Sequence, residues 1–181
     1  MILLVNKDNI FNENDISNFE MIEYENFKED TLFIERETFR HYEMLKAHLR
    51  IEGIEIDILD AYRSLEMQEN IFLKYMSKYG IDDAESICAM PGTTDHHTGQ
   101  AIDICFRYND MWMFNEDEMF EHEEVLLRIH KVLKYFGFVL RYPKGKEHIT
   151  GFKYEPWHIR YVGEDVAMKI GDMTLEEYLN K

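Results

Sequence analysis

The sequence predicts an α+β fold in which helices flank a small antiparallel sheet. Segments with helical periodicity and segments with strand-like alternation are interspersed, without the regular strand–helix–strand rhythm of a parallel sheet. The length of 181 residues fits one domain. Hydrophobic residues make up 45% of the chain and aromatic residues 14%, which is enough for one core. We therefore expect one structural domain overall, with residues 1–35 as an N-terminal wrapping segment and residues 36–181 as the main body.

The first part of the chain is expected to contribute short strands, a helix and a longer strand. Residues 1–35 are irregular and rich in Asn, Asp and Glu, with short apolar pieces such as 31–34. Apolar residues at helical spacing predict a helix over 36–52. Alternating apolar and polar residues over 54–59 predict a strand with one buried face.

A second helix is expected between Ser64 and Tyr79. Ser64 is a good N-cap residue, and the glycine that follows Tyr79 is a common stop signal. The helical spacing predicts four inward-facing side chains, namely Met67, Ile71, Phe72 and Tyr75.

The second half of the chain predicts three further strands and two helices. Strands are expected over 101–106, 138–142 and 158–162, and the apolar spacing predicts a helix over 118–136. A short helix over 175–179 closes the chain. The order of these elements is that of an α+β protein.

The charge balance excludes some classes of partner. The chain has 20 Lys and Arg residues against 36 Asp and Glu residues, giving a formal net charge of −16. Such a surface repels nucleic acid and anionic membranes. The apolar run at the N-terminus is too short for a signal peptide, and no stretch is long enough to span a membrane. We therefore expect a cytoplasmic protein with two reduced thiols, Cys88 and Cys105.

Two short stretches contain residues that suit a catalytic metal. Residues 94–103 include His96 and Asp103, and Glu155-Pro156-Trp157-His158 adds a second imidazole and a spare carboxylate. His96, Asp103 and His158 together give three N/O ligands and leave a fourth position open, which is typical of catalytic zinc. Glu155 then lies where a general base for a metal-activated water is needed. The residues therefore predict a Zn²⁺-dependent hydrolase.

These stretches resemble motifs of the zinc D-alanyl-D-alanine peptidases, which include the vancomycin-resistance D,D-peptidases and related peptidoglycan carboxypeptidases. Residues 94–103 resemble the family's Ser-x-His-x-x-Gly-x-Ala-x-Asp motif, and 155–158 resemble its Glu-x-Trp-His motif. Residues 60–64 resemble the Tyr-Arg-Ser segment, and the run 140–163 resembles the carboxypeptidase branch more than the strict dipeptidase branch. One departure is Thr94, where the family has serine. The resemblance covers roughly residues 36–163.

The resemblance implies a fold and a set of residue roles. The fold would be that of the D,D-peptidases and of the Hedgehog signalling domain, with the zinc site on the sheet and 36–181 as the catalytic domain. The implied roles are metal binding by His96, Asp103 and His158, proton transfer by Glu155, and oxyanion stabilisation by Arg63.

Several further residues have open roles. Asp60, Gln68 and Thr94 are candidate substrate contacts, although each also suits a structural role, and Asp60 would then orient Arg63. His97 is interpreted as a residue outside the ligand set that points away from the metal if its segment is extended. Two arginines, Arg141 and Arg160, either brace the site or bind a substrate carboxylate.

The function expected from this resemblance is D-alanyl-D-alanine carboxypeptidase activity on peptidoglycan precursor peptides that end in D-Ala. Cleavage of the free dipeptide is a related possibility, and L,D-carboxypeptidase activity on tetrapeptide stems is the alternative. A zinc-containing binding module without catalysis is a distant alternative, which the presence of both Glu155 and Arg63 disfavours. The sequence leaves the oligomeric state and any role in antibiotic resistance open.

Overall fold

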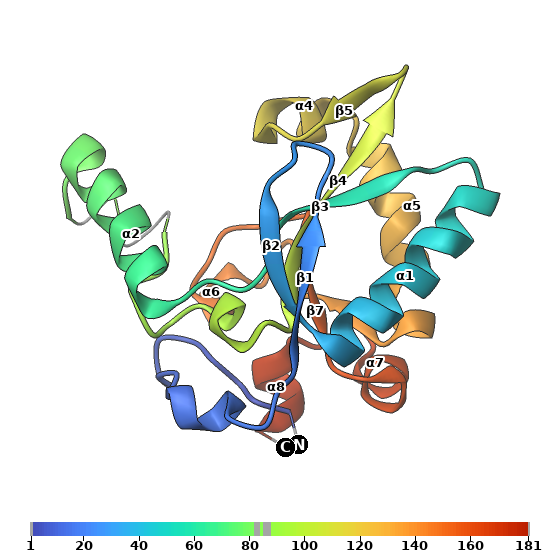
Figure 1. The fold of residues 1–181 in the computed structure, drawn as a ribbon. Helices are drawn as coiled ribbons and strands as arrows, with labels where there is room; N and C mark the ends of the chain where they lie inside the picture. Colours follow the sequence, from blue (N-terminus) through green and yellow to red (C-terminus); the bar gives the residue numbers. More distant parts are fainter. Residues whose placement is uncertain (1, 82–83, 85–87, 181) are drawn as a thin grey trace.

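A computed structural model describes residues 2–81, 84 and 88–180, and its centre is an antiparallel sheet. The strand order is β3-β4-β7-β6, and a short strand β5 pairs with the far end of β4. These strands are β3 (Ile56–Asp60), β4 (Ala101–Tyr108), β5 (Met111–Met113), β6 (Phe138–Leu140) and β7 (His158–Tyr161). The predicted α+β class with an antiparallel sheet is confirmed (Figure 1).

Two helices cover the sheet and bury its apolar side chains. Helix α1 (Arg36–Ile51) packs against β3, and α5 (Glu123–Leu133) packs against β6 and α1 (Figure 1). The core includes Leu45 of α1, Ile58 of β3 and Ile104 of β4, each with an exposed fraction of 0%. Burial of each such side chain contributes about 1.5–3 kcal/mol, so this layer anchors the strands that carry the site.

An N-terminal hairpin lies beside this core. Strands β1 (Met21–Glu25) and β2 (Thr31–Glu35) form a separate two-stranded antiparallel sheet that follows a short 3₁₀ turn η1 (Glu13–Ile16). Ile34 of β2 is fully buried in the main core. The predicted strand-like piece at 31–34 therefore forms part of β2, whereas the sequence did not resolve its partner strand. The division into segments 1–35 and 36–181 stays a prediction.

Helix α2 (Leu65–Tyr79) extends away from the body of the molecule (Figure 1). Its start is as predicted, because the Ser64 side chain accepts a hydrogen bond from the Met67 backbone nitrogen at 3.1 Å. The predicted inward orientation of Met67 is wrong, since its exposed fraction is 50%. The helix buries only Gln68 and Phe72, because it packs against a short local cluster instead of the main core.

The single helix predicted over 118–136 is also wrong. The structure has α4 (Glu116–Glu121), α5 from Glu123, and a final 3₁₀ turn η3 (Lys134–Phe136). The break lies at His122, whose backbone leaves the helical region at φ −117° and ψ 35°. Its imidazole stacks on Tyr108 of β4 with ring centroids 4.0 Å apart. The stacking of His122 on Tyr108 therefore accompanies a break in the chain's helical path, which the apolar periodicity does not reveal.

The C-terminal elements bring both ends of the chain to one side of the molecule. They are α6 (Glu147–Thr150), α7 (Glu164–Ile170) and α8 (Leu175–Leu179). Helix α8 has the predicted bounds, whereas α7 was not predicted. The two termini lie together beside α8 (Figure 1), where Ile2 and Leu4 pack against the cluster that contains Leu175. Among the described residues, no helix is long and apolar enough to cross a membrane.

Candidate metal centre

The strand register places three acidic or imidazole side chains in one row across the sheet. Asp103 of β4 pairs with His158 of β7, and on the other side with Asp60 of β3. Directly paired residues of antiparallel strands project from the same face. A register shift between Ile58 and Asp60 brings Asp60 opposite Asp103. The sheet therefore brings together residues that lie far apart in the sequence.

A 3₁₀ turn brings His96 to this row. The turn is η2 (Asp95–Thr98), and the Thr94 hydroxyl at its N-terminus accepts a hydrogen bond from the His96 backbone nitrogen at 3.4 Å. It ends at Gly99, whose φ of +69° is rarely adopted by other residues. A Cβ at Gly99 would lie 2.8 Å from the Met21 side chain and 3.2 Å from the Glu35 backbone nitrogen. The glycine of the motif is therefore required by both conformation and space.

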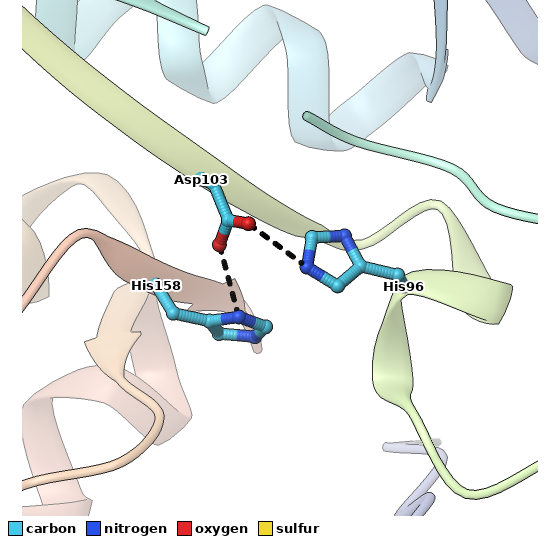
Figure 2. A group of neighbouring side chains, drawn as sticks. All are labelled: His96, Asp103 and His158. Carbon is cyan, nitrogen blue, oxygen red and sulfur yellow. Dashed lines mark ion pairs between the residues drawn. The ribbon is translucent and has the colours of Figure 1, made fainter. Parts of the chain in front are cut away.

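The three predicted metal ligands converge on one point (Figure 2). One potential ligand atom from each of His96, Asp103 and His158 lies within 4.8 Å of the others. Asp103 lies between the imidazoles, with Oδ1 3.0 Å from His158 Nδ1 and Oδ2 3.4 Å from His96 Nε2. All three side chains are largely buried. The arrangement is that of a three-ligand site with room for a fourth ligand.

The second nitrogen of each imidazole has its own partner. His96 Nδ1 lies 2.6 Å from the Ala61 carbonyl oxygen, and His158 Nε2 lies 3.0 Å from Asp95 Oδ1. Each of these nitrogens donates a hydrogen bond, so His96 Nε2 and His158 Nδ1 are the nitrogens that would bind a metal, which at His158 Nδ1 would replace a proton. The backbone and Asp95 thus select the tautomer that a metal ligand needs.

The chemistry of the site fits a bound cation. His96 Nε2 is buried without a hydrogen-bond partner among the described residues, and such orphaned polar atoms are rare in folded proteins. Although burial opposes the charge, Asp95 and Asp103 raise the pKa of His158 to about 10. The surroundings therefore favour positive charge at this point, and imidazole and carboxylate donors suit Zn²⁺.

Asp95 and two arginines form a buried charge cluster behind His158. Asp95 Oδ2 lies 3.3 Å from Arg141 Nε and 3.5 Å from an Arg160 terminal nitrogen. Burial opposes ionisation of Asp95, yet His158 and the arginines hold its pKa far below the usual range. Both arginines are fully buried, so they brace the site and do not reach a substrate carboxylate in this structure. Sequence reasoning missed Asp95, although its position next to His96 was a usable signal.

Arg63 is held from two sides at the edge of the metal centre. Its Nε forms an ion pair with Asp60 at 2.9 Å, and another guanidinium nitrogen donates to Gln68 Oε1 at 2.6 Å. A third guanidinium nitrogen lies 3.7 Å from Asp103. Gln68 is fully buried and also donates to the Ala89 carbonyl at 2.7 Å, so it lies behind Arg63. Asp60 and Gln68 thus orient Arg63, and direct substrate contact by either residue stays a prediction.

Glu155 lies beside the metal ligands and lines the same cavity. One carboxylate oxygen lies 3.6 Å from His158 Nδ1, and the Glu155 backbone nitrogen donates to the Tyr142 carbonyl at 3.2 Å. Burial raises the pKa of Glu155 to about 7, although His158 and Arg63 oppose the shift. A carboxylate with this pKa can both accept and return a proton near neutral pH.

The metal centre opens onto a cavity of about 250 Å³. Its walls include the three metal ligands, together with Arg63 and Glu155. Thr94, Tyr142 and Trp157 also line the cavity, and the Trp157 ring packs edge-on against Phe120 with centroids 5.6 Å apart. Cys88 also lines the cavity as a free thiol, whereas Cys105 is a free thiol in the core. Thr94 lies on the cavity wall, and its contact with a substrate stays a prediction.

His97 points away from the metal ligands and holds the Arg63 backbone. Its Nδ1 donates to the Arg63 carbonyl at 2.6 Å, and its Nε2 accepts from the Gly92 backbone nitrogen at 3.0 Å. Burial lowers the pKa of His97, so a single neutral tautomer satisfies both bonds. The segment is a 3₁₀ turn and not the extended strand on which the interpretation of His97 depended.

Replacement of His97 by alanine is expected to lower the free energy of unfolding by about 2–4 kcal/mol, because it leaves two buried backbone groups unpaired and creates a cavity. Urea unfolding of the metal-free protein measures this change. His148→Ala is the matched control, since His148 is exposed and its loss should change stability by less than about 0.5 kcal/mol. Equal stability of the two variants would contradict the structural role of His97.

The fold and the His–Asp–His group together place the chain in the class of the zinc metallopeptidases. The chain belongs to the VanY D-alanyl-D-alanine carboxypeptidase family, whose profile matches residues 31–164. The resemblance predicted from the sequence motifs is confirmed.

Individual relatives agree with this assignment. YodJ of Bacillus subtilis (strain 168), to which a carboxypeptidase activity has been provisionally assigned, is 41% identical over 132 residues. The match covers 72% of this chain but only 47% of YodJ, so the chain spans about half of that relative.

Two solved structures share the fold over nearly the whole chain. The LD-carboxypeptidase LdcB has a TM-score of 0.86 at 35% identity, and the match covers 98% of this chain and 85% of LdcB. A variant of the vancomycin-resistance D,D-pentapeptidase VanY in complex with Zn(II) has a TM-score of 0.78 at 29% identity, with 98% and 97% covered. The zinc in that relative agrees with the His–Asp–His group found here.

Proposed function

We propose that the protein is a zinc-dependent D-alanyl-D-alanine carboxypeptidase that removes the C-terminal D-Ala from peptidoglycan precursor peptides. The observation that carries this proposal is the convergence of three ligand atoms within 4.8 Å, with Glu155 and Arg63 on the walls of the same cavity. Membership of the VanY family supports the substrate class. Cleavage of free D-Ala-D-Ala by the same site is part of the proposal.

The proposed mechanism divides the work among the chain's own residues. His96, Asp103 and His158 would hold Zn²⁺, which when bound acts as a Lewis acid and lowers the pKa of water. Glu155 accepts a proton from the attacking water and delivers it to the nitrogen of the leaving D-Ala. Arg63 donates hydrogen bonds to the scissile carbonyl oxygen as negative charge develops on it.

The alternative substrate is a tetrapeptide stem with an L,D bond before its terminal D-Ala. The observation that favours this alternative is the similarity to LdcB, an LD-carboxypeptidase with a TM-score of 0.86. Both reactions use the same attack on an amide carbonyl, so the metal centre serves either one. The choice depends on side chains that contact the residue before the scissile bond.

A panel of three substrates tests the proposal. D-Ala release is measured from a pentapeptide ending in D-Ala-D-Ala, from the corresponding tetrapeptide and from free D-Ala-D-Ala. Release from the pentapeptide supports the D,D-carboxypeptidase, and release from the tetrapeptide alone supports the L,D alternative. Absence of release from both substrates that end in D-Ala-D-Ala would reject the first proposal.

The location of the protein in the cytoplasm stays a prediction.

Loss of the Arg63 guanidinium is expected to lower kcat/KM by about 10²–10³-fold, as for removal of other oxyanion donors. Arg63→Ala removes a group that lies beside the metal ligands and is held by Asp60 and Gln68. Steady-state kinetics of D-Ala release measures the effect. Arg40→Ala is the control, because Arg40 lies on the exposed face of α1 and pairs with Glu37. A similar kcat/KM for both variants would argue against the role of Arg63.

A further inference from the structure

The charge cluster behind His158 continues to the C-terminal helix. Both terminal nitrogens of Arg141 donate to the carboxylate of Glu176 on α8, at 3.0 Å and 2.7 Å. Arg141 Nε lies 3.3 Å from Asp95, which in turn accepts from His158 Nε2 at 3.0 Å. A continuous path of contacts therefore joins Glu176 to a metal ligand.

Every member of this path is shielded from solvent. The exposed fractions are 0% for Asp95, 1% for Arg141, 2% for His158 and 6% for Glu176. Although burial opposes it, Arg141 holds the pKa of Glu176 below its usual range, so Glu176 is ionised. Inside a protein, an ion pair of this kind is strong, and a charge left alone there is costly.

The residues at the far end of this path lie outside the part of the chain that the family profile matches. The family profile ends at residue 164, whereas Glu176 belongs to α8. From the other end of the chain, Asn6 donates to Glu176 at 3.1 Å, and the Val5 carbonyl accepts from Arg141 at 3.4 Å. These contacts agree with the position of both termini beside α8 (Figure 1).

Glu176 supplies one of the negative charges that face the buried arginines of the cluster. Two carboxylates, Asp95 and Glu176, are the anionic partners of the two buried arginines, Arg141 and Arg160. If Glu176 loses its charge, Arg141 retains only Asp95 as an anionic partner among the described residues. Asp95 would then be drawn toward Arg141 and away from His158. The His158 ring would lose the acceptor that holds Nε2–H and directs Nδ1 toward the metal.

We propose that Glu176 is a positioning residue of the metal centre, which acts through Arg141 and Asp95 on the orientation of His158. This inference rests on the metal assignment made under the proposed function. It extends the metal centre to a helix at the C-terminal end of the chain, beyond the motifs that contain the ligands.

The test compares two neighbouring carboxylates on α8. Glu176→Gln keeps the size of the side chain and removes its charge, whereas Glu177→Gln changes a half-buried carboxylate that pairs with Lys146. Zinc affinity is measured by competition with a chromophoric chelator, and Co²⁺ absorption spectra report the ligand geometry. We expect Glu176→Gln to bind zinc about 10-fold more weakly, at the lower end of the range for outer residues of metal sites. Glu177→Gln should bind zinc as the wild type does.

The outcomes separate this inference from the function proposed above. Failure of the wild type to bind zinc would reject the metal assignment itself. Wild-type zinc affinity and an unchanged Co²⁺ spectrum in folded Glu176→Gln would overturn only the role of Glu176. If Glu176→Gln does not fold by circular dichroism, Glu176→Asp replaces it, because it keeps the charge but cannot reach both Arg141 nitrogens. Its zinc affinity should lie between the wild-type value and a 10-fold loss, and an affinity equal to that of the wild type would also overturn the proposal.

Discussion

Replacement of Glu155 by glutamine is expected to lower kcat by about 10²–10⁴-fold, the range that general acid–base catalysis contributes. Glutamine has nearly the same shape but cannot accept a proton from water or return it to the leaving amine. The three metal ligands are unchanged, so zinc should stay bound. The kinetics of D-Ala release and the zinc content of the purified variant together measure this result.

Glu121→Gln is the matched control for this experiment, because Glu121 is an exposed carboxylate at the end of α4. It should keep the wild-type kcat. Wild-type turnover in Glu155→Gln would mean that another group moves the proton. Loss of zinc from Glu155→Gln would instead show that Glu155 supports the metal, in conflict with its place outside the group of three ligands.

Removal of the metal is expected to reduce D-Ala release to the rate without enzyme. Chelation should achieve this reversibly, and added Zn²⁺ should restore the activity of the wild type. Asp103→Ala should lose activity that zinc cannot restore, because Asp103 lies between the two imidazoles and is the only carboxylate in the ligand group. Activity assays with and without added zinc, combined with metal analysis, measure both results.

Asp117→Ala serves as the control for Asp103→Ala, since Asp117 is exposed on α4. It should retain both zinc and activity. Full activity after exhaustive chelation, verified by metal analysis, would show that the reaction does not depend on the site described here.

The elements that were predicted well have strong local signals. Helix α1 was expected over 36–52 and spans Arg36–Ile51, and α2 begins after the Ser64 cap as expected. The capping bond and the amphipathic periodicity both act within one or two turns, so a single sequence reveals them. The helix predicted over 118–136 shows the limit of this reasoning. Its break at His122 accompanies stacking on Tyr108, which belongs to a different part of the chain.

The metal ligands of the candidate site were predicted from the sequence, whereas a buried residue that supports them was not, for a similar reason. The motifs identified His96, Asp103 and His158, which the structure brings together. Asp95 was missed, because its position next to His96 is a weak signal in a chain with 36 acidic residues. Its complete burial against Arg141 depends on the packing of β6, η2 and α8, which no local pattern encodes.

The sequence by itself determined the family and the chemical identity and order of the candidate metal donors and of the proposed general base, because these are carried by residue types at short, fixed spacings. Only the tertiary structure decided how these groups are held. The register of β3, β4 and β7 aligns Asp60, Asp103 and His158 in one row. Folding also removes water from the cluster behind His158. Ion pairs between residues that are far apart in the sequence then become strong enough to orient a metal ligand.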